Sequence, residues 1–599
     1  MNKLQRSVFP KIDLCTEQDL YFRMNEFASL DLKSSVIHFE KNGRIFTNTY
    51  FNSFTIGKWK NYTVIEDLNL KLKFKGKIKI IFKLNHLYFN SKILNEIYFE
   101  SKETKEIIVP LSFFKELKDG MLFFEIRGLE ISEVYSFEYF TNTKVKNNIN
   151  LGIVITHFNR QQYVLPAIER LKKELIEVPE FKRKISLNIV DNSQNLPEVE
   201  GVNIVKNANL GGAGGFTRGL IYLQDQKEYT HCLFMDDDVS CEVEGIKRTI
   251  NLLEFAKKNN VSIAGAMLNE AKSYIQYENG AKFPGFWQPI NNNFDLRDRR
   301  CLLKNEEEVS IPAYGGWWFF AFPISEVKHY AFPYFVRGDD IGFGLVHKFN
   351  IITLNGISSW QGDFEIKNGV LSAYLDTRNH IMQRFHNLVP CNLKSIIKVS
   401  FSFLARNLLT YNYETALATV CAVEDVCKGP NFWRENVNMI KRRPEIAALA
   451  KDEKVVDIPL SKIDRSITFE ENENCEEVEV HEKKIKTFFR WITLNGHLIP
   501  TIFFKSGMVQ QKKGFGGTLR KVFRYKEVLY LHKLSGKGFI LKHSKVKFFK
   551  ILFRYFSAIL KLSLKYRKLH KEYLATYDEF TSREFWEKQF YEKKKEKSL

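Results

Sequence analysis

Three consecutive aspartates, Asp236, Asp237 and Asp238, follow the apolar stretch THCLFM and are well suited to chemistry. Carboxylates this close repel one another unless a cation lies between them. Mg²⁺ and Mn²⁺ prefer carboxylate oxygens and also bind the oxygens of a diphosphate. In an extended chain the first and third side chains point the same way, so Asp236 and Asp238 can share one ion. A solvated acidic loop is the alternative, and the triplet alone does not decide between the two.

A glycine-rich turn, NANLGGAGGFTRG (207–219), precedes the triplet, and a helix is predicted to start at Phe216. Four glycines precede the predicted helix start: Gly211, Gly212, Gly214 and Gly215. Glycines let the backbone approach a phosphate or a sugar closely, and the start of a helix attracts anions. The spacing is not that of a dinucleotide-binding GxGxxG motif. A merely flexible turn is the alternative interpretation.

Two motifs after the triplet could act on an acceptor. YGGWWFFAFP contains Trp317 and Trp318, whose rings either stack on a sugar or pack in the core. RGDDIGFG contains Asp339 and Asp340. One carboxylate of such a pair can take a proton from a hydroxyl group, although an isolated pair is more often part of a surface loop.

These motifs need a scaffold that brings them together. Between residues 148 and 388, continuous apolar runs alternate with amphipathic segments, which predicts an α/β domain with a mainly parallel sheet. Open sheets of this kind bind ligands at the carboxyl ends of their strands. Residues 1–147 alternate apolar residues with lysines, as in LKLKFKGKIKIIFKL (70–84), which predicts an all-β sandwich or barrel.

The C-terminal part divides by composition. Residues 389–468 are rich in helix formers, residues 469–486 form an acidic linker, and residues 487–599 are predicted to be a basic, mainly helical region. The net charge of the chain is +20, and residues 501–570 contain 18 Lys or Arg and one acidic residue, Glu527. The basic character therefore belongs to this region alone.

One basic segment, KVKFFKILFRYFSAILKLSLK (545–565), is predicted to be an amphipathic helix. Five cationic residues fall within about 60° of one helix face: Lys547, Lys550, Arg554, Lys561 and Lys565. Two interpretations remain open: an interfacial helix on an anionic membrane, or a helix packed on the protein with a solvated cationic face. No nucleic-acid partner is expected, because the charge lies outside the motif-bearing domain.

Composition excludes other classes. The eight cysteines are scattered without a CxxC pair, which argues against a disulfide framework or a zinc ribbon. The N-terminus has no apolar core of signal-peptide length, and no run of uncharged apolar residues is long enough to span a membrane. We therefore expect a cytoplasmic protein.

The order of the motifs THFNR, VDNS, NLGGAGG, FMDDD, GGWWF and RGDDIGFG resembles family-2 glycosyltransferases of the GT-A fold. Among them it resembles the bacterial galactofuranosyltransferases of the mycobacterial galactan-polymerase type. The resemblance implies an inverting transfer of galactofuranose from UDP-galactofuranose, with Mn²⁺ or Mg²⁺, to a lipid-linked or oligosaccharide acceptor in cell-surface polysaccharide synthesis. It also implies a peripheral location on the inner face of the plasma membrane, and self-association.

The resemblance assigns a role to each matching residue. Asp340 would be the general base that deprotonates the acceptor hydroxyl. The acceptor would be positioned by three residues: Trp317, Trp318 and Asp339. The donor would be bound by eight residues: Arg160, Asp191, Asn209, Gly211, Gly212, Gly214, Gly215 and Asp237. The metal would be held by Asp236, Asp238 and Gln361.

Two positions depart from the family pattern. In SSWQGDF (358–364), Gln361 stands where the family has a metal-binding histidine, and Asp363 or His380 could replace it. Gly342 stands where an acidic residue is common. Two other functions therefore stay open: another family-2 enzyme, such as a rhamnosyltransferase that uses a dTDP-sugar, and a catalytically silent scaffold that binds sugar nucleotides.

Overall fold

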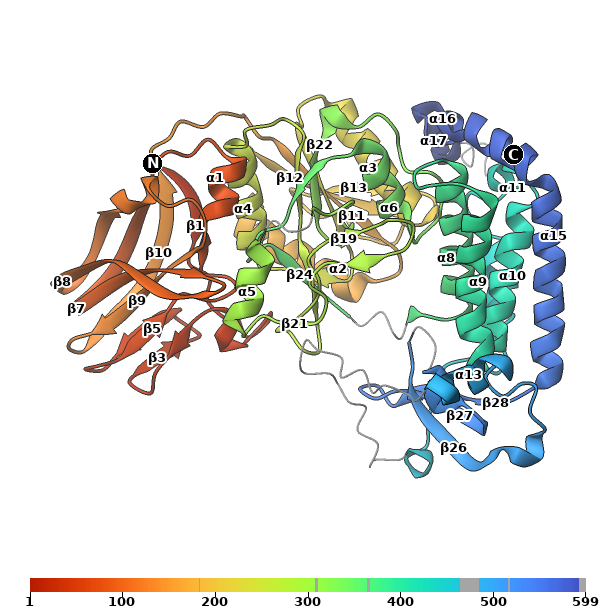
Figure 1. The fold of residues 1–599 in the computed structure, drawn as a ribbon. Coiled ribbons are helices and arrows are strands. Elements are labelled where there is room, and N and C mark those ends of the chain that lie inside the picture. The colour runs from red at the N-terminus through yellow and green to blue at the C-terminus, as the bar shows by residue number, and fades with distance from the viewer. Residues whose placement is uncertain (183, 308–310, 363–366, 464–483, 515–517, 592–599) are drawn as a thin grey trace.

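The computed structural model describes residues 1–599 except 183, 308–310, 363–366, 464–483, 515–517 and 592–599. Asp363 and most of the expected acidic linker lie outside the described residues. Figure 1 shows strands at the N-terminal end, an α/β region in the centre and a bundle of helices at the C-terminal end.

The N-terminal region is a network of ten strands with the order β2-β5-β9-β7-β10-β4-β3, to which β1, β6 and β8 add at the sides. The strands are β1 (Asn2–Arg6), β2 (Arg23–Met24), β3 (Ala28–Asp31), β4 (Val36–Phe39), β5 (Arg44–Phe46), β6 (Phe54–Thr55), β7 (Asn69–His86), β8 (Phe89–Pro110), β9 (Met121–Gly128) and β10 (Ser132–Thr141). The strand predicted at 70–84 is confirmed as part of β7. Its lysines pair across to glutamates of β8, as in Lys79–Glu96 at 2.6 Å. The choice between a sandwich and a barrel stays a prediction.

The central region has a seven-stranded sheet with the order β13-β12-β11-β14-β22-β16-β23. Its strands are β11 (Leu151–His157), β12 (Ile185–Asp191), β13 (Asn203–Lys206), β14 (His231–Asp236), β16 (Val261–Ala264), β22 (Phe320–Pro323) and β23 (Asn350–Ile352). The mainly parallel sheet is confirmed, because only β22 runs against its neighbours. Helix α3 (Gly211–Gln226) covers one face. Helices α2 (Gln161–Leu171) and α4 (Val243–Glu254) cover the other.

A second, five-stranded sheet lies beside the first and carries residues of the site. It contains β15 (Val239–Ser240), β17 (Ala266–Asn269), β18 (Ile275–Glu278), β21 (Phe294–Asp295) and β24 (Ser358–Gln361). Because β15 follows the aspartate triplet directly, its pairing with β24 brings a distant part of the chain next to that triplet. Helices α5 (Arg299–Glu306) and α6 (Asp339–His347) complete the region.

The C-terminal helices α8 (Val370–Phe385), α9 (Leu393–Leu409), α10 (Tyr413–Val426) and α15 (Lys545–Ala575) pack on one another around a common core. The prediction of a mainly helical region at 487–599 is wrong for 505–542. There, β26 (Lys505–Lys512), β27 (Tyr525–His532) and β28 (Lys537–Lys542) form a sheet with β25 (Val456–Asp457). The continuous apolar run VLYL in YKEVLYLH, followed by a turn at Gly536, is consistent with a buried strand there.

The chain returns to the central region at its C-terminal end (Figure 1). Helix α16 (Tyr577–Phe580) leads to α17 (Arg583–Tyr591), and the Trp586 indole donates to the carbonyl oxygen of Ala331 at 2.9 Å. Among the described residues, no helix combines the length and the apolar character that crossing a membrane requires.

Candidate active site

The carboxyl ends of three neighbouring parallel strands form the floor of the candidate site. β11 ends at His157, β12 at Asp191 and β14 at Asp236. The strand register pairs Thr156 with Asp236 and His157 with Asp191, so these ends lie level. β12 and β14 flank β11 on opposite sides, which makes this the point where the strand order reverses. Open α/β sheets bind their ligands at this point.

Cations from the chain itself compensate two of the three aspartates. The guanidinium of Arg160 lies 2.8 Å from Asp237 and 3.0 Å from Asp238, and the ammonium of Lys367 lies 2.6 Å from Asp238. Burial works against the Asp238 anion, but the two cations outweigh it and lower the Asp238 pKa. Asp236 makes no ion pair with any described residue. Burial and the neighbouring carboxylates raise its pKa to about 7.

The amide of Gln361 completes a set of oxygen ligands beside the triplet. Pairing of β15 with β24 places Gln361 opposite Val239, and its Nε2 lies 3.4 Å from Asp238 Oδ1. Its Oε1 is buried and has no hydrogen-bond partner among the described residues. No three His, Cys, Asp or Glu side chains in the described ranges form a metal cluster. Two carboxylates and an unsatisfied amide oxygen nevertheless fit a hard divalent cation.

Asp363 and His380 were the other two residues expected to replace the metal-binding histidine. Asp363 is outside the described residues. His380 lies on α8 and packs between Phe283 and Phe403, with ring centroids 5.4 and 5.3 Å away. Its Nδ1 is 2.8 Å from the carbonyl oxygen of Asp376. The ring of His380 is therefore used in packing, and the structure does not bring it into the triplet.

Asp191 organises the loop that follows β12. Its carboxylate accepts hydrogen bonds from the backbone amides of Ser193, Gln194 and Leu196, at 3.0, 2.8 and 2.8 Å. The side chain is fully buried. Asp191 thus lies at the predicted edge of the sheet, but its oxygens are directed to its own loop.

The glycine-rich turn packs against the loop before α6. Helix α3 begins at Gly211 instead of at Phe216, and Asn209 Oδ1 accepts from the Gly211 amide at 3.1 Å. Gly211 has φ +71°, and a Cβ there would lie 2.0 Å from the carbonyl oxygen of Phe335, so only glycine fits. A Cβ on Gly212 would lie 3.1 Å from Oδ2 of Asp339. The turn therefore joins the two acidic motifs.

The next two glycines also approach protein atoms. A Cβ on Gly214 would lie 2.3 Å from the Leu210 Cβ, and one on Gly215 would lie 2.3 Å from the Thr156 Cγ2. These positions need glycine for close packing of α3 on the sheet, whatever ligand binds at its start.

Asp339 and Asp340 open helix α6 behind Gly338. Burial, together with the charge of Asp340, raises the pKa of Asp339 well above its usual value. Burial also raises the pKa of Asp340 to about 6, although its Oδ1 accepts from the Ile341 amide at 2.8 Å. The charge of Asp236 contributes to the shift at Asp339, so the pair faces the triplet.

Side chains of α8 hold the loop in front of this pair. Three of them donate to loop carbonyl oxygens: Arg378 to Tyr334 (2.6 Å), Asn379 to Arg337 (2.6 Å) and Gln383 to Gly338 (3.1 Å). Three loop residues have positive φ: Phe335 (74°), Arg337 (71°) and Gly338 (77°). Such conformations persist only where the surroundings enforce them. The helical region therefore fixes the position of the acidic pair.

The two tryptophans are not brought together as one platform. Trp317 is buried on the α3 face of the sheet, with its ring centroid 5.0 Å from those of Phe216 and Phe234. Trp318 is buried in the core on the other face and donates to the carbonyl oxygen of Gly265 at 3.1 Å. Both rings contribute to packing in this structure.

Sequence reasoning missed Glu278 and Trp287. The Trp287 indole donates to Glu278 Oε2 at 2.7 Å, and its ring stacks on Tyr277 with 5.6 Å between centroids. Trp287 is 37% exposed. Burial and the charge of Asp340 raise the pKa of Glu278 to about 8. The stretch YENGAKFPGFW gave no motif, because only the fold brings Glu278 near Asp340.

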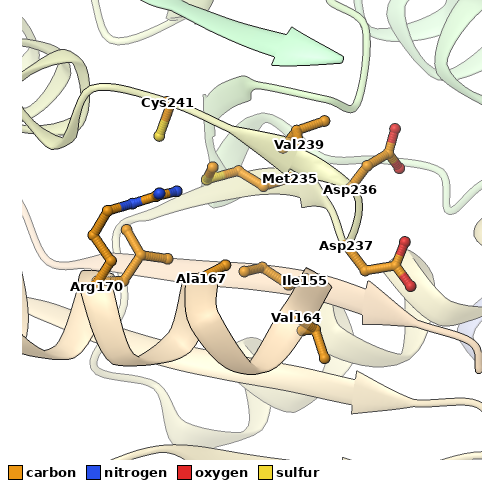
Figure 2. A pocket seen from close by; sticks show the side chains of 10 residues that line it. Ile155, Val164, Ala167, Arg170, Met235, Asp236, Asp237, Val239 and Cys241 are labelled. Carbon is orange, nitrogen blue, oxygen red and sulfur yellow. The ribbon is translucent and has the colours of Figure 1, made fainter. Parts of the chain in front are cut away.

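A small cavity lies behind the triplet, between α2 and β15 (Figure 2). The guanidinium of Arg170 points into it, towards Met235, and Cys241 closes one side. The carboxylates of Asp236 and Asp237 point away from this cavity. The carboxylates of Asp236 and Asp237 therefore lie on the side away from this cavity.

With this geometry established, comparison with known proteins becomes informative. The chain is 23% identical over 426 residues to galactofuranosyltransferase GlfT2 of Mycolicibacterium smegmatis, and 23% identical over 423 residues to GlfT2 of Mycobacterium tuberculosis. The alignments cover 64% of this chain and 64% and 65% of those proteins. The chain resembles the galactofuranosyltransferases. This confirms the resemblance that the order of motifs indicated.

Two other comparisons add little. No family model matches the chain. Residues 1–349 of S. aureus TarS are 13% identical, with a TM-score of 0.28 over 52% of this chain and 94% of that one. A score this low carries no argument, so the description of the fold rests on the strand order and register. The alignments with the two galactofuranosyltransferases cover slightly less than two thirds of the length of those proteins.

Proposed function

We propose that this chain is an inverting glycosyltransferase that transfers galactofuranose from UDP-galactofuranose to a glycan or lipid-linked glycan acceptor. The observation that carries the proposal is the meeting of two acidic clusters across the glycine-rich turn. One is compensated by cations and lies at the strand ends; the other has raised pKa values. The similarity to galactofuranosyltransferases supports the choice of sugar.

On the donor side, Asp236, Asp238 and Gln361 would hold Mn²⁺ or Mg²⁺, which neutralises the departing diphosphate. Arg160 is held by Asp237 at 2.8 Å and supplies a fixed positive charge at the same edge. The start of α3 would support this edge mainly by packing, because the Gly211 and Ala213 amides already donate to Asn209 Oδ1 and to the carbonyl oxygen of Phe335.

On the acceptor side, Asp340 would take the proton of the attacking hydroxyl. A pKa of about 6 leaves this carboxylate ionised at neutral pH and still basic enough to accept a proton. Burial and the charge of Asp340 raise the pKa of Asp339 well above its usual value, and its side chain would position the acceptor. Trp287, held by Glu278, offers an exposed ring on which the apolar face of a sugar could stack.

The test is transfer measured with a panel of sugar nucleotides, with and without Mn²⁺ or Mg²⁺, and with the product linkage determined by NMR. We expect turnover with UDP-galactofuranose and a dication only. Binding of dTDP in preference to UDP would favour the rhamnosyltransferase alternative. Nucleotide binding without transfer to any acceptor would favour the silent scaffold, to which Gln361 and Gly342 point.

We further propose that α15 binds the anionic inner face of the plasma membrane. Four large apolar side chains recur on its exposed side at spacings of three and four: Phe553, Phe556, Leu560 and Leu564. The predicted cationic row lies beside them. Lys547 and Arg554 pair with Asp452 and Glu424, while Lys550, Lys561 and Lys565 are exposed. Apolar and cationic side chains together favour an anionic lipid surface.

Liposome sedimentation tests this part separately. We expect binding to vesicles that contain phosphatidylserine, weaker binding at high salt, and loss of binding when Phe553 and Leu560 are both replaced by serine. The matched control replaces two buried-side neighbours conservatively, Ile551→Val and Leu562→Ile. Equal sedimentation of all variants with phosphatidylserine vesicles would contradict the membrane proposal.

A further inference from the structure

A loop of the central region, residues 283–287, lies against helix α8. The carbonyl oxygen of Gly285 accepts a hydrogen bond from Arg384 Nη2 at 2.7 Å. Gly285 has φ +117°, and a Cβ there would lie 2.9 Å from the same guanidinium nitrogen. Next to it, the ring centroids of Phe283 and His380 lie 5.4 Å apart. The loop is therefore fitted closely to the side chains of α8.

Arg384 is a buried cation whose hydrogen bond outside its own helix goes to this loop. It is 3% exposed, and its Nη1 donates to the carbonyl oxygen of His380, one turn earlier in α8, at 2.9 Å. Its guanidinium carbon lies 5.6 Å from the ring centroid of Phe286. Among the described residues, no carboxylate forms an ion pair with Arg384, and its Nε has no hydrogen-bond partner. Because a buried charge is costly unless hydrogen bonds satisfy it, the bond to Gly285 ties the loop to the helix.

The loop ends at Trp287, the exposed ring that we propose stacks on the acceptor. Tyr277 covers one face of this ring, with 18° between the two planes, so a sugar can stack only on the other face. Glu278 Oε2 holds the indole nitrogen at 2.7 Å, whereas the backbone of the loop is held from α8 by Arg384. A binding surface keeps its shape only where supporting contacts hold it within about 0.5 Å.

We propose that Arg384 is a positioning residue for the acceptor, which holds the loop so that the open face of Trp287 stays fixed relative to Asp340. The same helix holds the loop in front of Asp340, through Asn379 and Gln383. Helix α8 would therefore set both the stacking surface and the base, although it belongs to the helical region. This inference rests on the proposed function and extends it to a residue that does not touch the acceptor.

Hydrogen exchange followed by mass spectrometry tests the anchor on the full-length protein without any substrate. We expect the amides of residues 283–287 to exchange at least about threefold faster in Arg384→Met, because the bond to the loop is lost. The matched control, Arg44→Met, removes an exposed arginine of β5 and should leave this exchange unchanged. If Arg384→Met does not fold, Arg384→Gln takes its place. Equal exchange in the Arg384 and Arg44 variants would overturn the inference.

Steady-state kinetics tests the effect on recognition, with UDP-galactofuranose as donor and an alkyl galactofuranoside as the acceptor probe. We expect Arg384→Met to raise the acceptor KM about threefold and to leave kcat and the UDP dissociation constant unchanged. Arg384→Lys, which keeps a charged donor, should restore most of the affinity. An unchanged acceptor KM in Arg384→Met would overturn the inference.

A double variant shows whether Arg384 acts through the ring of Trp287. In the Trp287→Ala background, Arg384→Met should raise the acceptor KM no further, because the surface that it positions is already gone. Additive effects of the two substitutions would show that Arg384 acts elsewhere and would overturn the inference. Absence of transfer by the wild type with every sugar nucleotide would instead overturn the proposed function.

Discussion

The two acidic clusters of this site are compensated in different ways. At the end of β14, Arg160 and Lys367 lie within 3.0 Å of the carboxylates of Asp237 and Asp238 and compensate them. At the start of α6, burial is the largest effect, and the pKa values of both carboxyls rise. The first cluster is arranged around cations of the chain itself. The second is arranged to hold and release protons, so similar residues acquire different chemistry from their surroundings.

The largest loss of transfer rate is expected when Asp340 is replaced. Asp340→Ala should lower the transfer rate by about 10²–10⁴-fold, the usual contribution of a general base, and leave the UDP dissociation constant unchanged. UDP release measures the rate and calorimetry measures binding. Transfer at the wild-type rate would show that the base is elsewhere.

A smaller loss is expected at the metal side. Asp236→Asn should reduce kcat/KM by about 10²-fold and weaken Mn²⁺-dependent UDP binding, because one of two anionic ligands is lost. Asp31→Asn, which removes an exposed carboxylate of the N-terminal region, is the control. Equal Mn²⁺ affinity in the two variants would remove Asp236 from the ligand set.

The pH dependence of kcat/KM tests the proposed difference between the two acidic clusters. The base acts as its anion, and burial raises the pKa of Asp340 to about 6. Log kcat/KM should therefore rise with a slope of about one below pH 6 and level off above it. Stopped assays in constant-ionic-strength buffers measure this profile. A flat profile between about pH 5 and 7 would contradict the assignment.

A smaller effect, on the acceptor KM, is expected at Trp287. Trp287→Ala should raise the acceptor KM about fivefold, since an aromatic contact contributes about 1 kcal/mol, and should change kcat little. Trp287→Phe should keep most of the affinity. An unaltered acceptor KM in Trp287→Ala would exclude this ring from the acceptor site.

The smallest effect on catalysis is expected at Trp317. Trp317→Phe should lower the free energy of unfolding by about 1–2 kcal/mol through lost packing, and should leave both KM values unchanged. Denaturant unfolding and steady-state kinetics measure the two quantities. A selective rise in acceptor KM would restore the stacking role that the sequence indicated.

Much of the central fold was predictable from the chain. Continuous apolar runs ending in polar motifs identified β11, β12 and β14, because strands buried on both faces have few polar positions. The order of the motifs also indicated the resemblance to galactofuranosyltransferases. The strands at 505–542 were missed, because their short continuous apolar runs do not distinguish a strand from a buried helix segment.

The candidate site was predictable only in part. The strand ends and the two acidic motifs follow from local sequence. Glu278 and Lys367 gave no signal, because each reaches the site through pairing and packing of segments far apart in the chain. The glycines of the turn were expected to face a ligand, whereas Gly211 and Gly214 are required by nearby protein atoms.

By itself, the sequence determined which residues can carry charge at the carboxyl edge of the sheet and in which order they occur. The tertiary structure alone decided their protonation and their partners. A carboxyl group keeps or loses its proton according to burial and nearby charges, and those depend on strand register and helix packing that adjacent residues do not encode. This is why the two cations lower the pKa of Asp238 at the end of β14, while burial raises the pKa of Asp339 at the start of α6.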